Sequence, residues 1–471
     1  MIKISAPGIC LALLPVCLSC FKTKEKPEKP NVLFIAVDDL RPELNCYGQA
    51  QIHSPNIDKI AAEGILFNRA YCNIPVSGAS RASVMTGLRP ARDRFLHYYT
   101  RADEDAPGVV CLSQHFKDNG YTTLSNGKVF HHLDDREESW DELWRPLETT
   151  TWRDYQLPDN IQKDTTGTKR GPAFERAALD DTAYFDGKIA SKTIEDLKRL
   201  KKEGKPFFLA AGFLKPHLPF NAPDRYWDLY PESSINLPGN DFRPEGAPDV
   251  AMTNWGELRA YDGIPESGPL TDSAALQLIH GYYACVSYTD AQIGKVINAL
   301  EELELAENTI VILWGDHGWN LREHGLWCKH CLFQTSLRST LILKVPWMSG
   351  GEMTNGVVEF VDIYPTLCDL AGLEKPVHLE GQSFTGLIED PTGKGKAGAV
   401  SQWFDGITLN TGEYSYTEWL NKEGEMYNSM LYNHLNDWEE NVNIVEDPGY
   451  EEVITELHNL LHQLKGEDYW K

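Results

Sequence analysis

The sequence predicts an α/β fold: a large, mostly parallel or mixed sheet between layers of helices, followed by a smaller α+β subdomain. Strand-like apolar runs alternate with amphipathic helices up to about residue 375, which is typical of a parallel sheet covered on both faces. Beyond that point the pattern changes to short strand candidates and one final helix. A chain of 471 residues can bury one large core or two unequal ones.

The first expected strand, 32–37, is an unbroken apolar run that ends at Asp38-Asp39, as a strand buried on both faces should. A helix then starts at Ser54-Pro55, with a capping serine and proline at its first position, and stops at Gly64. Further strands are expected at 65–67, 122–124, 207–212, 309–314 and 341–345. Further helices are expected at 112–119, 193–202, 274–284, 290–303 and 363–371.

Two less regular regions complete the domain prediction. Residues 133–181 are polar with weak periodicity, which indicates long surface insertions. The expected main domain is 31–375, and the expected C-terminal subdomain is 376–471. Its last helix, 450–465, carries Val453, Leu457, Leu460, Leu461 and Leu464 on one face.

The first thirty residues are expected to lie outside the fold. Residues 1–20 have a short positive start and an apolar stretch too short for a stable membrane anchor, which predicts a signal peptide. Leu18-Ser19-Cys20 resembles a bacterial lipoprotein cleavage box with Cys20 as the lipidated residue, and 21–30 then forms a tether. We therefore expect an exported protein, in the periplasm or anchored to the outer membrane of a Gram-negative bacterium. Secretion without lipid is the alternative.

Charge and cysteine content exclude several function classes. The net charge of −25 argues against nucleic acid or an anionic membrane surface as the main partner, although a few converging basic side chains can still bind a polyanionic sugar. Seven of the ten cysteines lie beyond the leader, and an odd, scattered set is no disulfide framework. Cys328 and Cys331 are expected to be ordinary thiols of a loop, with a local disulfide as the alternative.

Acidic residues follow two of the expected strands. Asp38-Asp39 comes after 32–37, and Asp316-His317 comes after 309–314. Because ligands gather at the carboxyl ends of strands in an open parallel sheet, these residues are candidate metal ligands. Three carboxylates and one imidazole favour calcium or magnesium over zinc. The alternative for each pair taken by itself is that its polar side chains only interact with water where the strand leaves the core.

The segment Ser77-Gly78-Ala79-Ser80-Arg81 makes this chemistry specific. It resembles the signature of the formylglycine-dependent sulfatases, a branch of the alkaline phosphatase superfamily, and it stands in the same order relative to the acidic pairs. The resemblance extends from about residue 31 to 373 and is closest to the iduronate-2-sulfatase branch. Further matching stretches are 37–42, 46–48, 54–58, 127–131, Lys215-Pro216-His217, 316–319, 323–325 and Lys329.

The resemblance implies that Ser77 is oxidised to formylglycine, whose hydrate attacks sulfur. Serine at this position, with Ala79 in place of the more frequent proline, is similar to the variants that a radical, serine-type maturase modifies in anaerobic bacteria. Cys72 lies five residues upstream and lacks the Ser-Arg that the signature requires. If Ser77 remains a serine, the protein is expected to bind sulfated glycans without catalysis.

The family resemblance also assigns roles to other residues. It implies one Ca²⁺ per chain, held by Asp38, Asp39, Asp316, His317 and the modified Ser77. Arg81 would orient the aldehyde hydrate, and Lys128 and Lys329 would bind the sulfate oxygens. His217 would protonate the departing sugar oxygen, and His131 would help to remove the proton from the second hydroxyl.

The expected function is therefore hydrolysis of sulfate esters in a uronic-acid-containing glycan, with 2-O-sulfate of iduronate or glucuronate as the first candidate. The expected partners are a sulfated oligosaccharide and the maturase. Four alternatives remain open at this stage: an exo-sulfatase for another polysaccharide such as an algal one, a phosphate or phosphonate monoester hydrolase, a non-catalytic glycan-binding lipoprotein, and a structural role for the individual residues.

Overall fold

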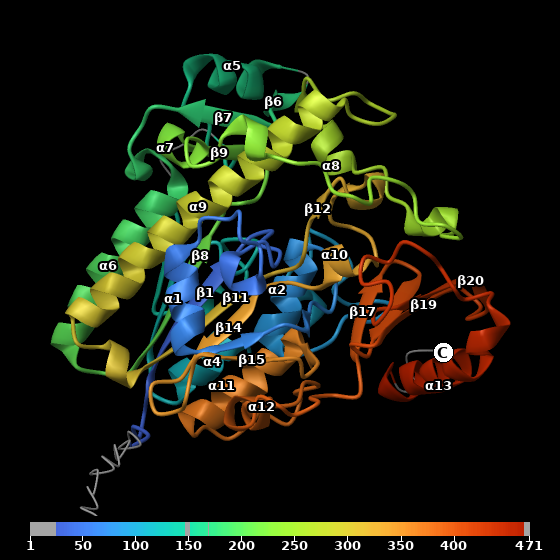
Figure 1. Ribbon diagram of the computed structural model, residues 1–471. Coiled ribbons are helices and arrows are strands. Elements are labelled where there is room, and N and C mark those ends of the chain that lie inside the picture. Colours follow the sequence, from blue (N-terminus) through green and yellow to red (C-terminus); the bar gives the residue numbers. More distant parts are fainter. Residues whose placement is uncertain (1–24, 147–150, 168, 466–471) are drawn as a thin grey trace, which may run out of the picture.

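A computed structural model describes residues 25–146, 151–167 and 169–465 and is built on one large sheet (Figure 1). The strand order is β15-β2-β14-β11-β1-β8-β4-β5. Only β14 runs antiparallel to its neighbours, β11 and β2, so the predicted mostly parallel sheet is confirmed. The strands are β1 (Asn31–Val37), β2 (Ile65–Phe67), β4 (Thr122–Gly127), β5 (Glu142–Trp144), β8 (Phe207–Phe213), β11 (Thr309–Gly315), β14 (Leu341–Lys344) and β15 (Glu352–Thr354).

Helices cover both faces of this sheet (Figure 1). On one face α1 (Pro55–Glu63), α6 (Phe185–Glu203) and α9 (Asp272–Glu302) pack together. On the other lie α2 (Ser77–Thr86), α4 (Leu112–Asp118) and α11 (Ile363–Ala371). All seven residues of β1 are buried, as expected for a central strand with helices on both sides.

The α9 helix differs from the prediction of two helices, 274–284 and 290–303. The helix is continuous because the tertiary structure holds residues 285–289, which link the two predicted helices. Several of these linking residues are β-branched or aromatic and are weak helix formers. The Tyr288 hydroxyl donates to the Asp181 carbonyl at 3.0 Å, and the Thr289 hydroxyl donates to the Lys215 carbonyl at 3.0 Å. The α6 helix likewise begins at Phe185, well before the predicted residue 193.

The prediction that 133–181 forms only surface insertions was wrong in part. This region supplies β5 to the edge of the main sheet. It also supplies the helix α5 (Pro158–Thr166) and the strands β6 (Arg170–Pro172) and β7 (Phe174–Ala177). The strand β6 pairs with β10 (Tyr261–Asp262), and β7 pairs with β9 (Phe220–Pro223), in small sheets above one end of the main sheet (Figure 1). Strands of three or four residues are too short to give a clear period-2 signal.

The C-terminal part is a four-stranded antiparallel sheet, β17 (Ala399–Trp403), β18 (Gly406–Asn410), β19 (Tyr414–Leu420) and β20 (Met426–Asn433). The helix α13 (Glu451–Lys465) packs on it through Leu457 and Leu461, as its apolar face predicts (Figure 1). The short elements are α3 (Ala102–Asp105), α7 (Asp224–Trp227), α8 (Gly256–Arg259), α10 (Gln334–Leu337), α12 (Thr385–Glu389), β3 (Ala70–Tyr71), β12 (Asn320–Leu321), β13 (Trp327–Cys328) and β16 (Val358–Glu359).

Several smaller expectations can be compared with this structure. Ser54 stands at the N-cap of α1, but its hydroxyl donates to Asp58 and makes no capping bond. Cys328 and Cys331 are free thiols, and within the described ranges all seven cysteines are free. The predicted leader and the first four residues of the tether, 21–24, lie outside the described residues. None of the helices within those residues is long and apolar enough to cross a membrane.

Candidate active site

The carboxyl ends of β1 and β11 bring the predicted acidic residues together. Val37 and Gly315 are paired in register, so Asp38 and Asp316 leave neighbouring strands at the same level. The main-chain N–H of Asp39 donates to Asp316 Oδ1 at 3.0 Å, and His317 Nε2 lies 3.3 Å from Asp39 Oδ1. All four side chains are almost fully buried. The expectation that these strand ends meet is therefore confirmed.

Ser77 is the first residue of α2 and lies beside this acidic cluster, with only 3% of its surface exposed. Its Oγ is 3.2 Å from Asp38 Oδ1 and 3.1 Å from His317 Nε2. A glycine is needed at the next position, because a Cβ on Gly78 would lie 2.1 Å from the Tyr98 carbonyl oxygen. The chain thus crosses tightly over the start of α2 and holds Ser77 against the cluster.

Arg81 ties α2 to three strand ends. Its Nε donates to Asp316 Oδ2 at 2.9 Å, its Nη2 donates to Asp38 Oδ1 at 2.9 Å, and its Nη1 donates to the Val129 carbonyl at 3.1 Å. The side chain is fully buried. A rigid guanidinium fork suits such a junction, and its contacts fix the carboxylates around Ser77.

Two lysines balance the remaining charge. Lys128, which follows β4, forms an ion pair with Asp38 Oδ2, and Lys329 lies 3.1 Å from both oxygens of Asp39. Burial raises the pKa of Asp38, but Lys128 and Arg81 outweigh it and hold the pKa well below its usual range. Burial dominates at Asp39 and raises its pKa in spite of Lys329. The cluster thus holds charged groups of both signs out of water.

The two predicted histidines have contrasting surroundings. His217 Nδ1 lies 2.5 Å from the Leu218 carbonyl, and its Nε2 lies 3.0 Å from Glu257 Oε1, so both nitrogens face acceptors. The Nδ1 of His131 is buried and has no hydrogen-bond partner among the described residues. Burial, reinforced by Lys128, lowers the pKa of His131 well below its usual range.

Glu257 of α8 is a site residue that the sequence did not reveal. It accepts from His217 and also forms an ion pair with Lys329 at 2.9 Å. Burial raises the pKa of Glu257, but Lys329 and His217 outweigh it and keep the pKa well below its usual range. The residue lies in a four-residue helix with no motif around it, so only the three-dimensional contacts identify it.

These groups line a cavity of about 900 Å³. Ser77, Lys128, His131, His217 and Lys329 all face it, together with Asp38 and Glu257. Its outer wall includes Tyr98, Trp152 and Arg170. The Arg170 guanidinium carbon lies 5.8 Å from the centroid of the Trp152 ring, and Nη1 is buried without a hydrogen-bond partner among the described residues. The cavity therefore offers cationic groups both at its base and in its wall.

The donor set fits a hard divalent cation. Asp39, Asp316 and His317 place one potential ligand atom each within 4.8 Å of one another, and so do Asp38, Asp39 and His217. Oxygen donors predominate, and the carboxylates are buried, which suits Ca²⁺ or Mg²⁺ better than a softer metal. Asp38, Asp39, Asp316 and His317 are thus able to hold such an ion beside Ser77.

The carboxyl edge of this mostly parallel sheet carries a serine, carboxylates able to bind a metal ion, and lysines. This combination is typical of a hydrolase that acts on anionic esters. The family model described as Sulfatase matches residues 30–373, and one described as N-sulphoglucosamine sulphohydrolase, C-terminal, matches 322–467. The chain belongs to the sulfatase family and is a sulfuric ester hydrolase.

Individual relatives agree with this assignment. Iduronate 2-sulfatase of Mus musculus is 34% identical over 399 residues, which cover 75% of this chain and 71% of that protein. The fold is also similar to a solved structure titled as a 2-O GAG sulfatase, with a TM-score of 0.71, 21% identity and coverage of 93% and 92% of the two chains. Phosphonate monoester hydrolase from Silicibacter pomeroyi has the same fold, with a TM-score of 0.76, 19% identity and coverage of 93% and 95%.

Proposed function

We propose that this sulfatase removes sulfate esters from a uronic-acid-containing glycan, with 2-O-sulfate of iduronate or glucuronate as its main substrate. The observation that carries this proposal is the position of Ser77: it borders the cavity between Asp38 and His317, with Lys128, Lys329 and His217 around the same space. In the proposal Ser77 is converted to formylglycine, whose hydrate supplies a hydroxyl nucleophile for sulfur. A Ca²⁺ ion held by the acidic cluster would offset charge on the sulfate oxygens.

The side chains divide the remaining work according to their surroundings. Lys128 and Lys329 bind the sulfate oxygens as point charges. His217 faces two acceptors and acts as the general acid that gives a proton to the departing sugar oxygen. His131 is kept neutral by its low pKa and accepts a proton through a ring nitrogen when the sulfated enzyme breaks down. Arg81 keeps Asp38 and Asp316 in place beside Ser77.

The sugar specificity rests on a second anionic group. A 2-O-sulfated uronate carries a carboxylate as well as the sulfate ester, and the Arg170 side chain in the cavity wall is the cation proposed to pair with that carboxylate. Trp152 in the same wall offers an apolar ring face for a sugar. The mouse relative is named for iduronate 2-sulfate, and a structural neighbour is titled a 2-O GAG sulfatase. A pocket of this size suits the end of an oligosaccharide, which favours exo action.

The test is to express the chain with a serine-type maturase and measure both the modification and the activity. Intact peptide mass should show Ser77 lighter by about two hydrogens, as oxidation of an alcohol to an aldehyde requires. Sulfate release should then be fastest from disaccharides with a terminal 2-O-sulfated uronate. Release only from algal polysaccharide fragments, or hydrolysis only of phosphonate monoesters, would contradict the proposed substrate. Glycan binding without turnover by the converted protein would indicate a non-catalytic binder.

The cellular location is part of the same proposal. The pattern of residues 1–20 supports export, and Cys20 is the proposed site of a lipid anchor. Radiolabelled palmitate should enter the native protein, and Cys20→Ala should abolish the label and release the protein from the membrane fraction. Wild-type protein that carries no label would overturn the anchor while leaving the catalytic proposal intact.

A further inference from the structure

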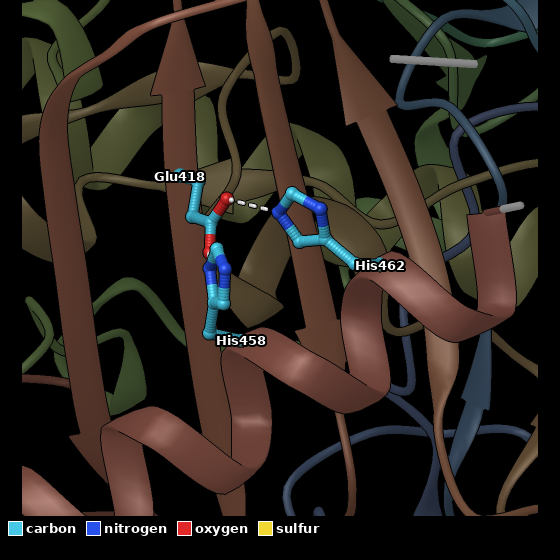
Figure 2. A group of neighbouring side chains, drawn as sticks. All are labelled: Glu418, His458 and His462. Carbon is cyan, nitrogen blue, oxygen red and sulfur yellow. Dashed lines mark hydrogen bonds and ion pairs between the residues drawn. The ribbon is translucent and has the colours of Figure 1, made fainter. Parts of the chain in front are cut away.

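A cluster of metal-binding side chains lies in the C-terminal subdomain, outside the cavity described above. It consists of Glu418 on β19 and of His458 and His462 on α13 (Figure 2). His458 Nδ1 lies 2.6 Å from Glu418 Oε1, and His462 Nε2 lies 3.2 Å from Glu418 Oε2. Figure 2 shows both rings reaching from the helix toward the same carboxylate.

The surroundings make this carboxylate unusual. The Glu418 side chain is only 1% exposed, and it lies at the contact between the sheet and α13, where the neighbouring packed residues are apolar. Tyr416 and Leu420 stand two residues before and after it and belong to that apolar cluster, as do Leu457 and Leu461 of the helix. A buried charge in such a place requires a cationic or metal partner. The groups that face it here are the imidazoles of His458 and His462 and the hydroxyl of Tyr416.

The two histidines are separated by four residues on one helix, which places them one turn apart on the same face. Their ring centroids are 4.1 Å apart. The third donor comes from a strand forty positions earlier in the chain. The donors are two imidazole nitrogens at helical spacing and one carboxylate oxygen from the strand. This donor set binds zinc and similar transition metals.

We propose that Glu418, His458 and His462 bind a divalent transition metal ion of the zinc class. A tetrahedral zinc ion with bonds of about 2.1 Å needs ligand atoms about 3.4 Å apart. His462 Nε2 is already close to this distance from one Glu418 oxygen, while His458 Nδ1 is closer to the other oxygen, so the His458 ring and the carboxylate both have to shift to bind one ion. The His458 side chain is 44% exposed, so it has room to move and leaves an entry path for the ion.

The site differs in chemistry from the acidic cluster beside Ser77. That cluster presents mainly carboxylate oxygens, which suit a hard cation, whereas this one presents two nitrogens and one oxygen. The metal would join α13 to β19 and leave its fourth position to water. Since the unfolded chain has no preformed site, binding there would stabilise the folded subdomain.

The test compares metal binding by the full-length wild type with that by three variants, His458→Ala, His462→Ala and Glu418→Gln. Each protein is dialysed in millimolar Ca²⁺, to saturate the hard-cation cluster, and then titrated with Zn²⁺ alone by calorimetry. The wild type should bind one equivalent of zinc more than each variant. Gln463→Ala, an exposed change between His462 and the end of the same helix, should retain the wild-type number. Equal zinc numbers for the wild type and all three ligand variants would overturn the proposal.

A second measurement covers variants that fold less well. Zinc at about one hundred times its Kd should raise the Tm of the wild type and of Gln463→Ala by about 3 °C. In the histidine variants this shift should disappear, whatever their starting Tm. Co²⁺ in place of zinc should give a tetrahedral visible spectrum in the wild type only. If the ligand substitutions lower the Tm but Zn²⁺ and Co²⁺ have no effect on the wild type, the cluster is an ion pair between histidine and glutamate, and the metal site is refuted.

Discussion

Two buried charge clusters in this chain look alike in composition but are built differently. Besides the cluster around Ser77, Glu359 and Asp362 pair with Arg89 and Lys396, and both carboxylates are 1% exposed. We call this second group the Glu359 cluster. Burial acts against ionisation in both places, and at one carboxylate of each cluster lysine and arginine outweigh it: the pKa of Asp38 is held well below its usual range, and the pKa of Glu359 is lowered to about 2. A low pKa alone therefore does not distinguish them.

The difference lies in what binds the carboxylate oxygens. In the Glu359 cluster main-chain donors add to the side chains of Arg89 and Lys396: Val400 N–H donates to Glu359 at 2.9 Å, and the N–H groups of Glu359 and Gln382 donate to Asp362 at 3.0 and 2.7 Å. In the cluster around Ser77, the contacts of Asp38 and Asp39 come from side chains, namely Ser77, Arg81, Lys128 and Lys329. Side chains can exchange partners when a substrate or an ion arrives, whereas main-chain donors cannot. The cluster proposed as catalytic differs from the Glu359 cluster in that its carboxylates are bound by side chains and it borders a cavity.

The largest expected effect is on catalysis. Ser77→Ala in matured enzyme should reduce kcat by about 10⁴-fold or more, because it removes the nucleophile, while the Tm changes by less than about 2 °C. Steady-state sulfate release and calorimetry measure the two quantities. Ser83→Ala on the same helix is the matched control: its hydroxyl donates to the Leu88 carbonyl, away from the cavity, so kcat should be retained. Wild-type turnover by Ser77→Ala would rule out this residue as the nucleophile.

The next largest effect should be on stability. Glu359→Ala leaves Arg89 and Lys396 without their buried carboxylate and should cost about 3–5 kcal/mol in the free energy of unfolding. The fraction that remains folded should keep its kcat, because the Glu359 cluster does not line the cavity. Urea unfolding measures the loss, and Glu352→Ala, an exposed change on β15, serves as the control. A fall in kcat without a loss of stability would remove the distinction between the two clusters.

Glu257→Gln should have an intermediate effect on kcat, of about 10–100-fold, equivalent to about 1.4–2.8 kcal/mol. The substitution keeps the shape but removes the charge that pairs with Lys329 and faces His217. In a plot of kcat against pH, both the acidic and the basic limb should move. A purely structural role of Glu257 would leave this pH profile unchanged. Glu266→Gln, an exposed change in the following loop, should alter neither kcat nor the profile.

The smallest effect concerns pH. The pKa of Glu359 is lowered to about 2 in the folded protein, against an ordinary value of 4.5, so its charge stabilises the fold above about pH 4.5. This contribution is lost as the pH falls from 4.5 toward 2. The difference in unfolding free energy between the wild type and Glu359→Gln should therefore be about 1 kcal/mol smaller at pH 3.5 than at pH 6. Urea titrations at the two pH values measure it, and a larger difference at pH 3.5 would contradict the assignment.

The sequence predicted the parts of the site that follow directly from local structure. Asp38, Asp39, Asp316 and His317 stand immediately after strands, and parallel strands bring their ends to one edge. Glu257 could not be predicted, because it lies in a four-residue helix without a recognisable motif and meets Lys329 only in the folded structure. The continuity of α9 could not be predicted either, because hydrogen bonds to other parts of the structure hold residues of weak helix propensity in the helix. In the C-terminal helix the apolar face was predicted correctly, but the partner of His458 and His462 lies on a strand whose register no local pattern specifies.

The burial of Ser77 has a consequence for timing. His317, one of the two residues in contact with the Ser77 hydroxyl, is synthesised 240 residues later, so during synthesis the Ser77 segment exists for a long interval without it. Once β11 joins β1, only 3% of the Ser77 surface remains exposed, and a second protein has no access to its Cβ. If Ser77 is oxidised as proposed above, the maturase reaches it more easily before the sheet is complete than afterwards. On that proposal, the order of events in biosynthesis determines which molecules carry the modification.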